Sequence, residues 1–237
     1  MTASSGTTTS ASNGLLVGYN TDKAKAWLCD CLQENVRSPL PFQFLGEINM
    51  IDSKDSLLAY LAADRLVQPE PKNPLKRLFG ARVVCLKTHL RKAEYHHNIG
   101  GGWHRVAYYW HLFRLKKLSA QFCSEIPINV FGKGLVIWHP ERIIVNPQSK
   151  IGDYCSLSSG VVIAQAHDQC PVIGDYVELM IDSKVLGGIN VADHTRVGAN
   201  ALVLKDIAES NTTWAGVPAR KINDRGTIET PIVPYKH

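Results

Sequence analysis

An aliphatic residue recurs every six positions between residues 151 and 208 of this chain. A period of six fits neither an amphipathic helix nor a strand whose side chains alternate. It does fit a triangular coil in which each six-residue step makes one flat face and one corner, with three steps per turn. The series therefore predicts a parallel β-helix with the repeating residue inside. Its members are Ile151, Leu157, Ile163, Ile173, Leu179, Val185, Val191, Val197 and Val203, with one four-residue slip after Ile163.

The positions four residues after each repeating residue support this interpretation. They are mostly small or β-branched, as tight corners would require, and comprise Cys155, Val161, Val177, Ser183, Thr195 and Ala201.

Residues 15–123 lack the six-residue period and carry helical signals instead. Apolar spacings of three and four predict helices over residues 21–34 and 53–66, with Thr21, Ser53 and Asp55 as caps. Two further helices are predicted over residues 75–98 and 103–122, separated by three consecutive glycines. The last helix is rich in aromatic and basic residues. This stripe has two interpretations: a site for phosphate or sugar, or a helix packed by its aromatics with its charges in solvent.

We therefore expect an α+β protein with a disordered tail (1–14), a helical domain (15–123), a β-helix (124–222) and a C-terminal tail (223–237). The hydrophobic fraction is 45% and the charged fraction 20%, which is typical of a globular domain. No apolar run approaches the roughly 20 residues of a membrane span. The first 14 residues lack the pattern of a secretory signal.

The charge and the cysteines exclude several classes of partner. The net charge of +5 is mild, and the basic residues cluster between Lys72 and Lys117 and near Arg220. This pattern favours anionic ligands over nucleic acid. The six cysteines show no metal-ligand spacing, so we expect buried thiols in a reducing cytoplasm and no metal.

Two segments resemble a known family. Residues 130–139 (VFGKGLVIWH) and 143–146 (IIVN) resemble the first coils of serine O-acetyltransferases, and still more the serine-acetyltransferase-like enzymes of surface-polysaccharide clusters. Residues 215–220 (AGVPAR) resemble the terminal motif of hexapeptide-repeat acyltransferases. The resemblance covers about residues 90–222. It implies a left-handed β-helix, a homotrimer, and acetyl-CoA bound in the cleft between neighbouring subunits.

Acetyl transfer from a thioester to an alcohol requires removal of the hydroxyl proton. A neutral imidazole can take that proton and pass it to the departing thiolate, while backbone N–H groups stabilise the oxyanion. His139 is the candidate for this role because it aligns with the general base of the resembled family. It also lies two positions after the core residue Ile137, in an eight-residue step to Val145 that makes the wall bulge.

The chain departs from the serine enzymes around this histidine. Trp138 replaces the Asp that helps to hold the amino acid, and Ser124 stands where an orienting carboxylate is expected. Glu125 is the candidate substitute. Cys170 replaces a second histidine, and His167 in the same irregular stretch is the candidate to enter the site from a neighbouring subunit. A tryptophan face suits a sugar ring, so Trp138 is assigned to acceptor binding and favours a saccharide.

The resemblance places the pantetheine arm of the donor along the outer wall of the later coils. Gly198 and Ala199 are small enough for close approach, whereas Ile181, after Met180, stands where the family usually has a small residue. That bulk would narrow the channel. Cations suit the CoA phosphates, and the candidates are Arg196, Lys205, Arg220 and Lys221.

The leading hypothesis is an acetyl-CoA-dependent O-acetyltransferase acting on a saccharide hydroxyl in surface-polysaccharide or glycoconjugate synthesis. One alternative is a serine O-acetyltransferase of cysteine biosynthesis. Another is a catalytically inactive trimeric scaffold, which the bulk of Ile181 and the missing carboxylates favour. A metal-dependent hydratase of the carbonic-anhydrase type is disfavoured, because His139, His167 and His194 do not match that family's spacing.

Overall fold

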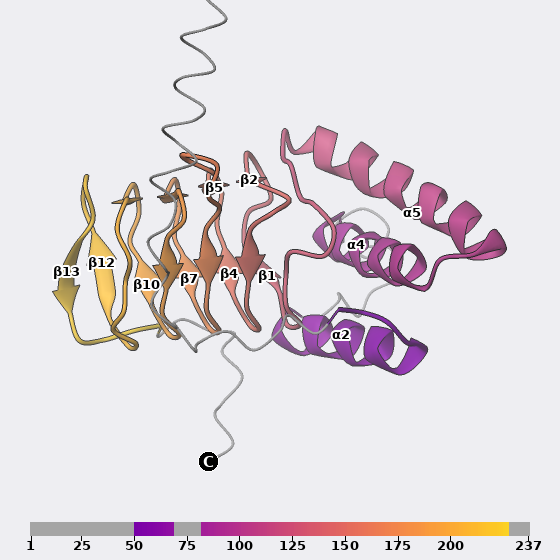
Figure 1. The fold of residues 1–237 in the computed structure, drawn as a ribbon, viewed down its shortest axis with the longest axis horizontal. Coiled ribbons are helices and arrows are strands. Elements are labelled where there is room, and N and C mark those ends of the chain that lie inside the picture. The colour runs from indigo at the N-terminus through magenta and orange to yellow at the C-terminus, as the bar shows by residue number, and fades with distance from the viewer. Residues whose placement is uncertain (1–49, 69–81, 228–237) are drawn as a thin grey trace, which may run out of the picture. The chain divides into compact units, whose positions relative to one another are not determined.

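The computed structural model describes residues 50–68 and 82–227, which fall within one compact unit. Figure 1 shows helices α2 (Lys54–Val67), α4 (Arg82–Ile99) and α5 (Gly102–Gln121), followed by a stack of short strands. The α+β fold class is confirmed. The expected tail over residues 1–14 and the expected helix over residues 21–34 lie outside the described residues.

The helix boundaries follow local signals. The Ser53 Oγ accepts a hydrogen bond from the Ser56 N–H, and the Ser56 Oγ accepts one from the Ser53 N–H, which together form a capping box for α2. The predicted cap at Ser53 is therefore confirmed. Gly100 and Gly101 have φ angles of 69° and 87°, a region that favours glycine, and they separate α4 from α5.

The strands form three parallel sheets that make the faces of a β-helix. The orders are β1-β4-β7-β10-β12-β13, β11-β8-β5-β2 and β3-β6-β9; among these strands of the described residues, β12 and β13 pair antiparallel and the other pairs are parallel. The strands are β1 (Val136–Ile137), β2 (Ile144–Val145), β3 (Lys150–Ile151), β4 (Ser156–Leu157), β5 (Val162–Ala164), β6 (Val172–Ile173), β7 (Glu178–Leu179), β8 (Lys184–Leu186), β9 (Asn190–Val191), β10 (Arg196–Val197), β11 (Leu202–Val203), β12 (Thr213–Ala215) and β13 (Arg220–Asn223).

The predicted core and corners are confirmed. All nine repeating aliphatic residues are at most 3% exposed, and they stack in register, as Leu157 does on Leu179. The six predicted corner residues are also buried. Each follows a residue in the left-handed region, such as Tyr154 (φ 55°) before Cys155. A sharp turn followed by a compact inward side chain explains the preference for small or β-branched residues at these positions.

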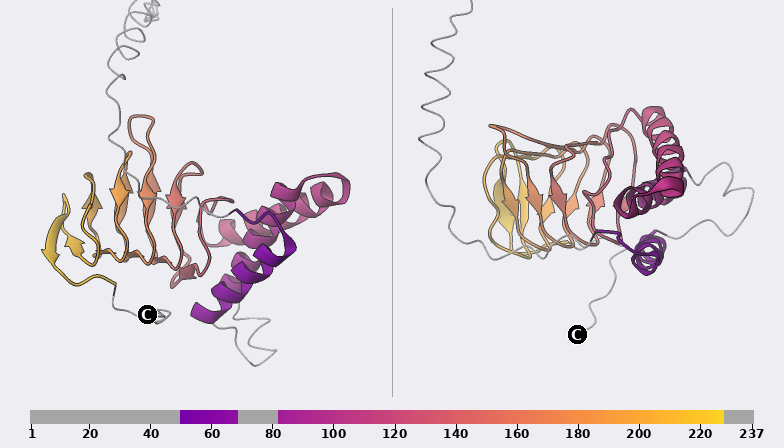
Figure 2. Two further views of the ribbon diagram at one scale, coloured as in Figure 1. Left: turned by 60° about the horizontal axis from the view of Figure 1, so that its bottom comes forward. Right: turned by 45° about the vertical axis from the view of Figure 1, so that its right-hand side comes forward.

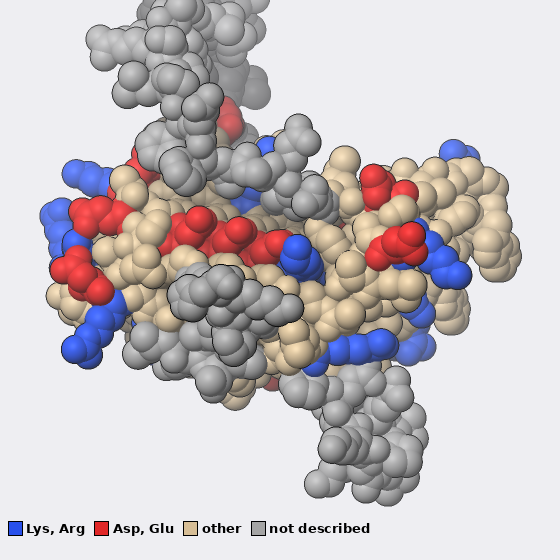
Figure 3. All heavy atoms as spheres, turned by 90° about the horizontal axis from the view of Figure 1, so that it is seen from below, with Lys and Arg blue, Asp and Glu red and all other residues tan. Residues whose placement is uncertain are grey.

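One corner carries two ladders of side chains. The Asp175 carboxylate accepts a hydrogen bond from the Asp153 N–H (2.7 Å), and the Asp193 carboxylate accepts one from the Asp175 N–H (2.8 Å). Next to them, Tyr176 stacks between Tyr154 and His194. Figure 3 views the molecule from below and shows a row of acidic side chains across the β-helix. These contacts tie successive coils together.

The expectation of buried thiols is correct for only part of the chain. Cys155 is buried, and burial raises the pKa of its thiol. Cys85 is exposed because it lies on the outer side of α4, and Cys123 is exposed because it follows the end of α5. Cys170 is half-buried. The first two cysteines of the chain lie outside the described residues.

Helices α2 and α4 close the first coil, which has no preceding coil to pair with. The Arg91 guanidinium donates to the carbonyls of Phe131 (2.9 Å) and Gly132 (2.6 Å), and the Lys87 ammonium donates to the carbonyl of Leu135 (2.7 Å). An open strand edge would leave such carbonyls unpaired. The helical side chains therefore act as the missing coil.

The charges of this cap balance one another in a buried cluster. Arg91 pairs with Asp64 (3.0 Å) and Glu94 (3.1 Å), and all three side chains are almost completely buried. Burial alone would lower the pKa of Arg91, but the two carboxylates outweigh it and hold that pKa above its usual value. Burial lowers the pKa of Lys87 to about 8, although Asp64 opposes the shift.

The β12–β13 hairpin closes the other end of the β-helix. The Leu202 N–H donates to the Gly216 carbonyl (3.0 Å), and the Ala219 N–H donates to the Leu202 carbonyl (2.8 Å). The chain then returns along the wall, where the Thr227 hydroxyl donates to the Tyr176 carbonyl (2.6 Å). The first residues of the predicted C-terminal tail therefore lie against the β-helix.

Candidate active site

His139 lies in an exposed loop at the corner between β1 and β2. The strand before it is fixed on both edges. The Trp138 N–H donates to the Leu157 carbonyl (3.0 Å) of the next coil, and the Gln68 side-chain amide donates to the Ile137 carbonyl (2.8 Å) from the end of α2. His139 therefore projects from a loop whose first end is rigid.

Ser124 fixes the other end of this loop. Its buried hydroxyl donates to the Pro140 carbonyl (2.5 Å) and accepts a hydrogen bond from the Ile143 N–H (2.9 Å). Ser124 thus holds the loop through its backbone, where the resembled family would place a carboxylate. Glu125 is exposed, and within the described residues its side chain makes no hydrogen bond or ion pair with His139.

His167 occupies the tip of the loop that follows β5. Ala166 and Gln169 exchange two backbone hydrogen bonds of 3.1 Å, and His167 and Asp168 between them have φ angles of 51° and 58°. Positive φ at both central residues is the geometry of a two-residue hairpin turn. Gln169 packs closely on the next coil, since a Cβ at Gly188 would lie 2.4 Å from its Oε1. The four-residue slip in the repeat is therefore an outward hairpin.

The three histidines of the β-helix lie at three different corners. His139 follows β1, His167 follows β5 and precedes β6, and His194 lies between β9 and β10. His194 stacks on Tyr176 at a centroid distance of 4.6 Å. One protomer does not bring these histidines together. The described residues contain no group of three or more His, Cys, Asp or Glu that could hold a metal ion.

Trp138 is 39% exposed on the outer face of the six-stranded sheet. The register of β1, β4, β7, β10 and β12 places Gly198 and Ala215 in the same outward column. A Cβ at Gly198 would lie 3.1 Å from the Ala215 Cβ. A side chain at Gly198 would therefore crowd Ala215 of the next coil, which favours a small residue there independently of any ligand.

Two of the remaining donor-site candidates, Ile181 and Ala199, are uncharged. Ile181 and Ala199 are neighbours at the next corner, where the Asn200 N–H donates to the Ile181 carbonyl (2.9 Å). Both are exposed, and Ile181 is 44% exposed, so its side chain projects from the corner. The structure therefore brings these two together with Gly198 on one edge of the wall.

The cations proposed for the CoA phosphates differ in their surroundings. Arg196 pairs with Glu178 (3.2 Å), and Lys221 pairs with Glu209 and with Asp224 (2.6 Å). Hydrogen bonds to Asp224 and Glu209 raise the pKa of Lys221. Lys205 and Arg220 are exposed, and no ion pair to either is found in the part of the chain that the structure describes.

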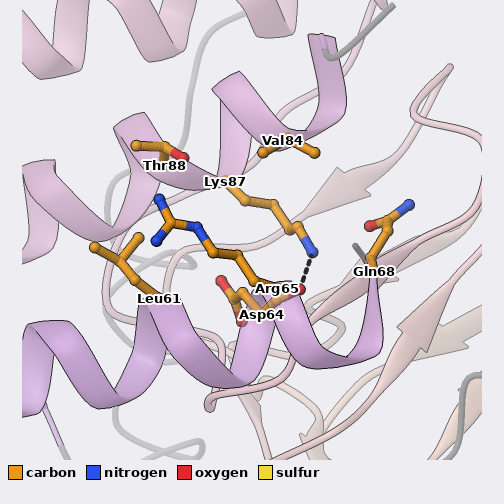
Figure 4. Close-up of a pocket in the computed structure, with 7 residues that line it drawn as sticks. All are labelled: Leu61, Asp64, Arg65, Gln68, Val84, Lys87 and Thr88. Atoms are coloured by element: carbon orange, nitrogen blue, oxygen red, sulfur yellow. Dashed lines mark hydrogen bonds between the residues drawn. The ribbon is translucent and has the colours of Figure 1, made fainter. Parts of the chain in front are cut away.

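Sequence reasoning missed the polar residues behind β1. Figure 4 shows a small pocket between α2 and α4, where the Lys87 ammonium donates to the Asp64 carbonyl (3.1 Å). The available signal was the helical spacing of charged Lys87 and Arg91 beside apolar Leu86 and Leu90. The pocket lining comprises Leu61, Asp64, Arg65, Gln68, Val84, Lys87 and Thr88.

Comparison with known proteins finds similarity to serine acetyltransferases. No family model matches it. It is 28% identical over 142 residues to the serine acetyltransferase of Synechococcus elongatus, covering 54% of this chain and 58% of that protein. It is 32% identical over 126 residues to the serine acetyltransferase of Helicobacter pylori strain J99, covering 50% of this chain and 72% of that protein. The chain thus spans little more than half of the Synechococcus relative.

Solved structures show the same fold. A serine acetyltransferase from Brucella abortus superposes with a TM-score of 0.56 at 23% identity, covering 73% of this chain and 69% of that chain. A serine acetyltransferase in complex with CoA superposes with a TM-score of 0.54 at 24% identity, covering 71% of each chain. The expected resemblance to hexapeptide-repeat acyltransferases is confirmed.

Proposed function

Because the chain belongs to the serine acetyltransferase family, we propose that it is an O-acetyltransferase that uses acetyl-CoA as donor and His139 as general base. The observation that carries this proposal is the placement of His139. Its loop is exposed, yet it is fixed at one end by Gln68 and Leu157 and at the other by Ser124. A general base must be accessible to substrate and also held in one place.

The chemistry asked of His139 is a two-way proton transfer. The neutral imidazole accepts the acceptor's hydroxyl proton while that oxygen attacks the thioester carbonyl. The imidazolium then returns the proton to the sulfur as the carbon–sulfur bond breaks. Acceptor oxygen and acetyl carbon form the new ester, so no covalent bond to the protein is required. Loss of a general base typically lowers the rate by about 10²–10⁴-fold.

For the donor, we propose a site along the edge formed by Gly198, Ala199 and Ile181. Lys205 and Arg220 are the first candidates for the CoA phosphates, because they are exposed and their charges are not offset by a carboxylate among the described residues. Arg196 and Lys221 are secondary candidates, since neighbouring carboxylates already pair with them. The Ile181 side chain projects from this edge and so leaves less room there for the pantetheine arm of the donor.

For assembly, we propose a homotrimer with active sites between subunits. The separation of His139 and His167 on different corners supports it, since only a second copy can bring a His167 to the His139 loop. The same arrangement is implied by the family resemblance. Within the described residues, no helix is long and apolar enough to cross a membrane.

For the acceptor, we propose L-serine as the first substrate to test. The relatives are serine acetyltransferases, and nothing in the comparisons favours a polysaccharide over serine. The leading expectation of a saccharide is therefore not supported over its alternative. Glu141 is exposed two residues after His139 and offers a carboxylate for an ammonium group. A saccharide remains the second candidate because of Trp138, the partly exposed residue that directly precedes His139.

The test is thiol release from acetyl-CoA with L-serine in one series and mono- and oligosaccharides in another. We expect serine-dependent release that falls by two or more decades in His139→Ala, with unchanged oligomeric state. His97→Ala is the matched control, because His97 is an exposed histidine on α4 outside the β-helix. A His139→Ala variant with near wild-type turnover would remove His139 from this role.

The acceptor series separates the remaining readings. If Glu141 holds the ammonium group, Glu141→Gln raises the KM for serine with little change in the KM for acetyl-CoA. Sugar-dependent release without serine-dependent release would restore the saccharide as acceptor. No release with either, together with no detectable CoA binding, would favour the inactive scaffold.

A further inference from the structure

Helix α5 carries a large aromatic face that does not pack on the rest of the described structure. Trp103 is 75% exposed, and Tyr109, Trp110 and Phe113 are each about 60% exposed. Of the two interpretations of this stripe, a helix packed by its aromatics is therefore wrong for these four residues. Several large apolar side chains exposed together on one face are typical of an interaction site.

The opposite face of α5 explains why the aromatics point outward. Within the pair of helices, histidines form the contact with α4. The His89 and His111 Nδ1 atoms lie 2.9 Å apart, and the His96 and His104 Nδ1 atoms lie 3.0 Å apart. Leu115 is fully buried in the core on the same side. Figures 1 and 2 show α5 running along α4 at the outside of the described structure.

The outer face has an apolar centre and basic edges. At about 100° per residue, Trp103, Val106, Trp110 and Phe113 fall in one stripe along the helix. The same spacing places Arg105 and Lys116 along one edge of the stripe and Arg114 along the other, with Lys117 within it near its C-terminal end. All of these side chains are exposed, and α5 contains no Asp or Glu.

From this arrangement we propose that the outer face of α5 binds the surface of a membrane that contains anionic phospholipid. Interfacial helices lie in the membrane plane with aromatic and aliphatic residues below and Lys or Arg beside the headgroups. Tryptophan and tyrosine favour this depth because each has an apolar body and a polar tip. This proposal is independent of the proposed acetyl transfer.

Charge favours a lipid surface over a second copy of the chain. Two α5 helices packed face to face would bring the basic edges of both copies together, and α5 has no carboxylate to offset them. Like charges held close are destabilising. An anionic headgroup layer instead attracts each Lys or Arg at its surface, enough to change binding by about fivefold per residue.

The proposal is tested with the full chain and two kinds of vesicle. One is phosphatidylcholine alone and the other is phosphatidylcholine mixed with phosphatidylglycerol. We expect sedimentation with the mixed vesicles, weakened by added salt and much weaker with neutral ones. Replacing Trp110 and Phe113 together by Ser should lower binding by more than tenfold, because it removes the apolar centre. Lys116→Gln with Lys117→Gln should lower it by about 25-fold, from fivefold per charge.

Controls distinguish membrane contact from unfolding and from self-association. Leu66→Ser on α2 is the matched control, because Leu66 is 64% exposed outside this face; it should bind as the wild type does. Brominated lipid should quench the fluorescence of Trp103 and Trp110, and the quenching should disappear when both are replaced by Phe. Absence of binding to the mixed vesicles would overturn the proposal. The proposal would also be overturned if the protein bound no vesicles and its oligomer became smaller when Trp110 and Phe113 are replaced. The face would then join two copies of the chain.

Discussion

Replacing Arg91 by Met should destabilise the protein by about 3–5 kcal/mol, the cost of breaking a buried ion pair from one side. The side chain is fully buried, and it bridges Asp64, Glu94 and the carbonyls of Phe131 and Gly132. Methionine fills most of the volume but leaves two carboxylates with one fewer cation. The two carbonyls also lose their donor, which favours the upper end of the range.

The assay is urea unfolding of the full chain at fixed protein concentration, followed by circular dichroism. Arg114→Met is the matched control, since Arg114 is exposed on α5 and its loss should change the free energy of unfolding by less than about 0.5 kcal/mol. A loss below about 1 kcal/mol for Arg91→Met at pH 8 would refute the argument that this guanidinium closes the first coil.

The same variant has an expected pH signature. Burial already raises the pKa of Glu94 in the native protein, although Arg91 opposes it. Without Arg91 that pKa rises further above the unfolded value of about 4.3. The folded variant then binds a proton that its unfolded chain does not bind, so its stability relative to the wild type increases as pH falls. The difference between the two proteins should therefore be smaller at pH 5 than at pH 8.

Three further predictions concern single residues. Ser124→Ala removes the hydroxyl between Pro140 and Ile143 and should cost about 1–3 kcal/mol in urea unfolding; an unchanged midpoint would contradict its role. Burial, and to a smaller extent the neighbouring His89, lowers the pKa of His111 to about 4. Only the unfolded chain takes up this proton between pH about 4 and 6.5, so stability should fall on acidification through that range, by about 1 kcal/mol after allowance for solvent screening; a midpoint that rises instead would contradict this. Ile181→Ala should lower the KM for acetyl-CoA without changing kcat, and an unchanged KM would remove Ile181 from the donor site.

The six-residue period predicted the β-helix because each of its positions has one fixed role. A residue such as Leu157 must point inward in every coil, and the corner residue four positions later is small or β-branched. These constraints are local and repeat along the chain, so they are visible in the sequence. The His139 loop was predictable for a related reason: an eight-residue step cannot keep the period and must bulge.

Other features depend on contacts that leave no periodic trace. Asp64 accepts a hydrogen bond from Leu135, which lies 71 positions away, and only the fold brings the two together. For α5, helical spacing located an aromatic stripe around Trp110 but did not say which side faces the protein. The histidines at His104 and His111 occupy the buried side instead, each opposite another histidine on α4.

Both ends of the β-helix are closed, so the stack of coils cannot be extended at either end. Each coil presents the same strand edges to the next coil. A stack with open ends would therefore pair with further coils, including those of another molecule. Arg91 and Lys87 stop growth at one end by substituting side-chain donors for backbone ones, and the antiparallel strand β13 stops it at the other by reversing the chain direction. Since neither terminator contacts the middle coils, the number of coils can change between relatives while both ends stay the same.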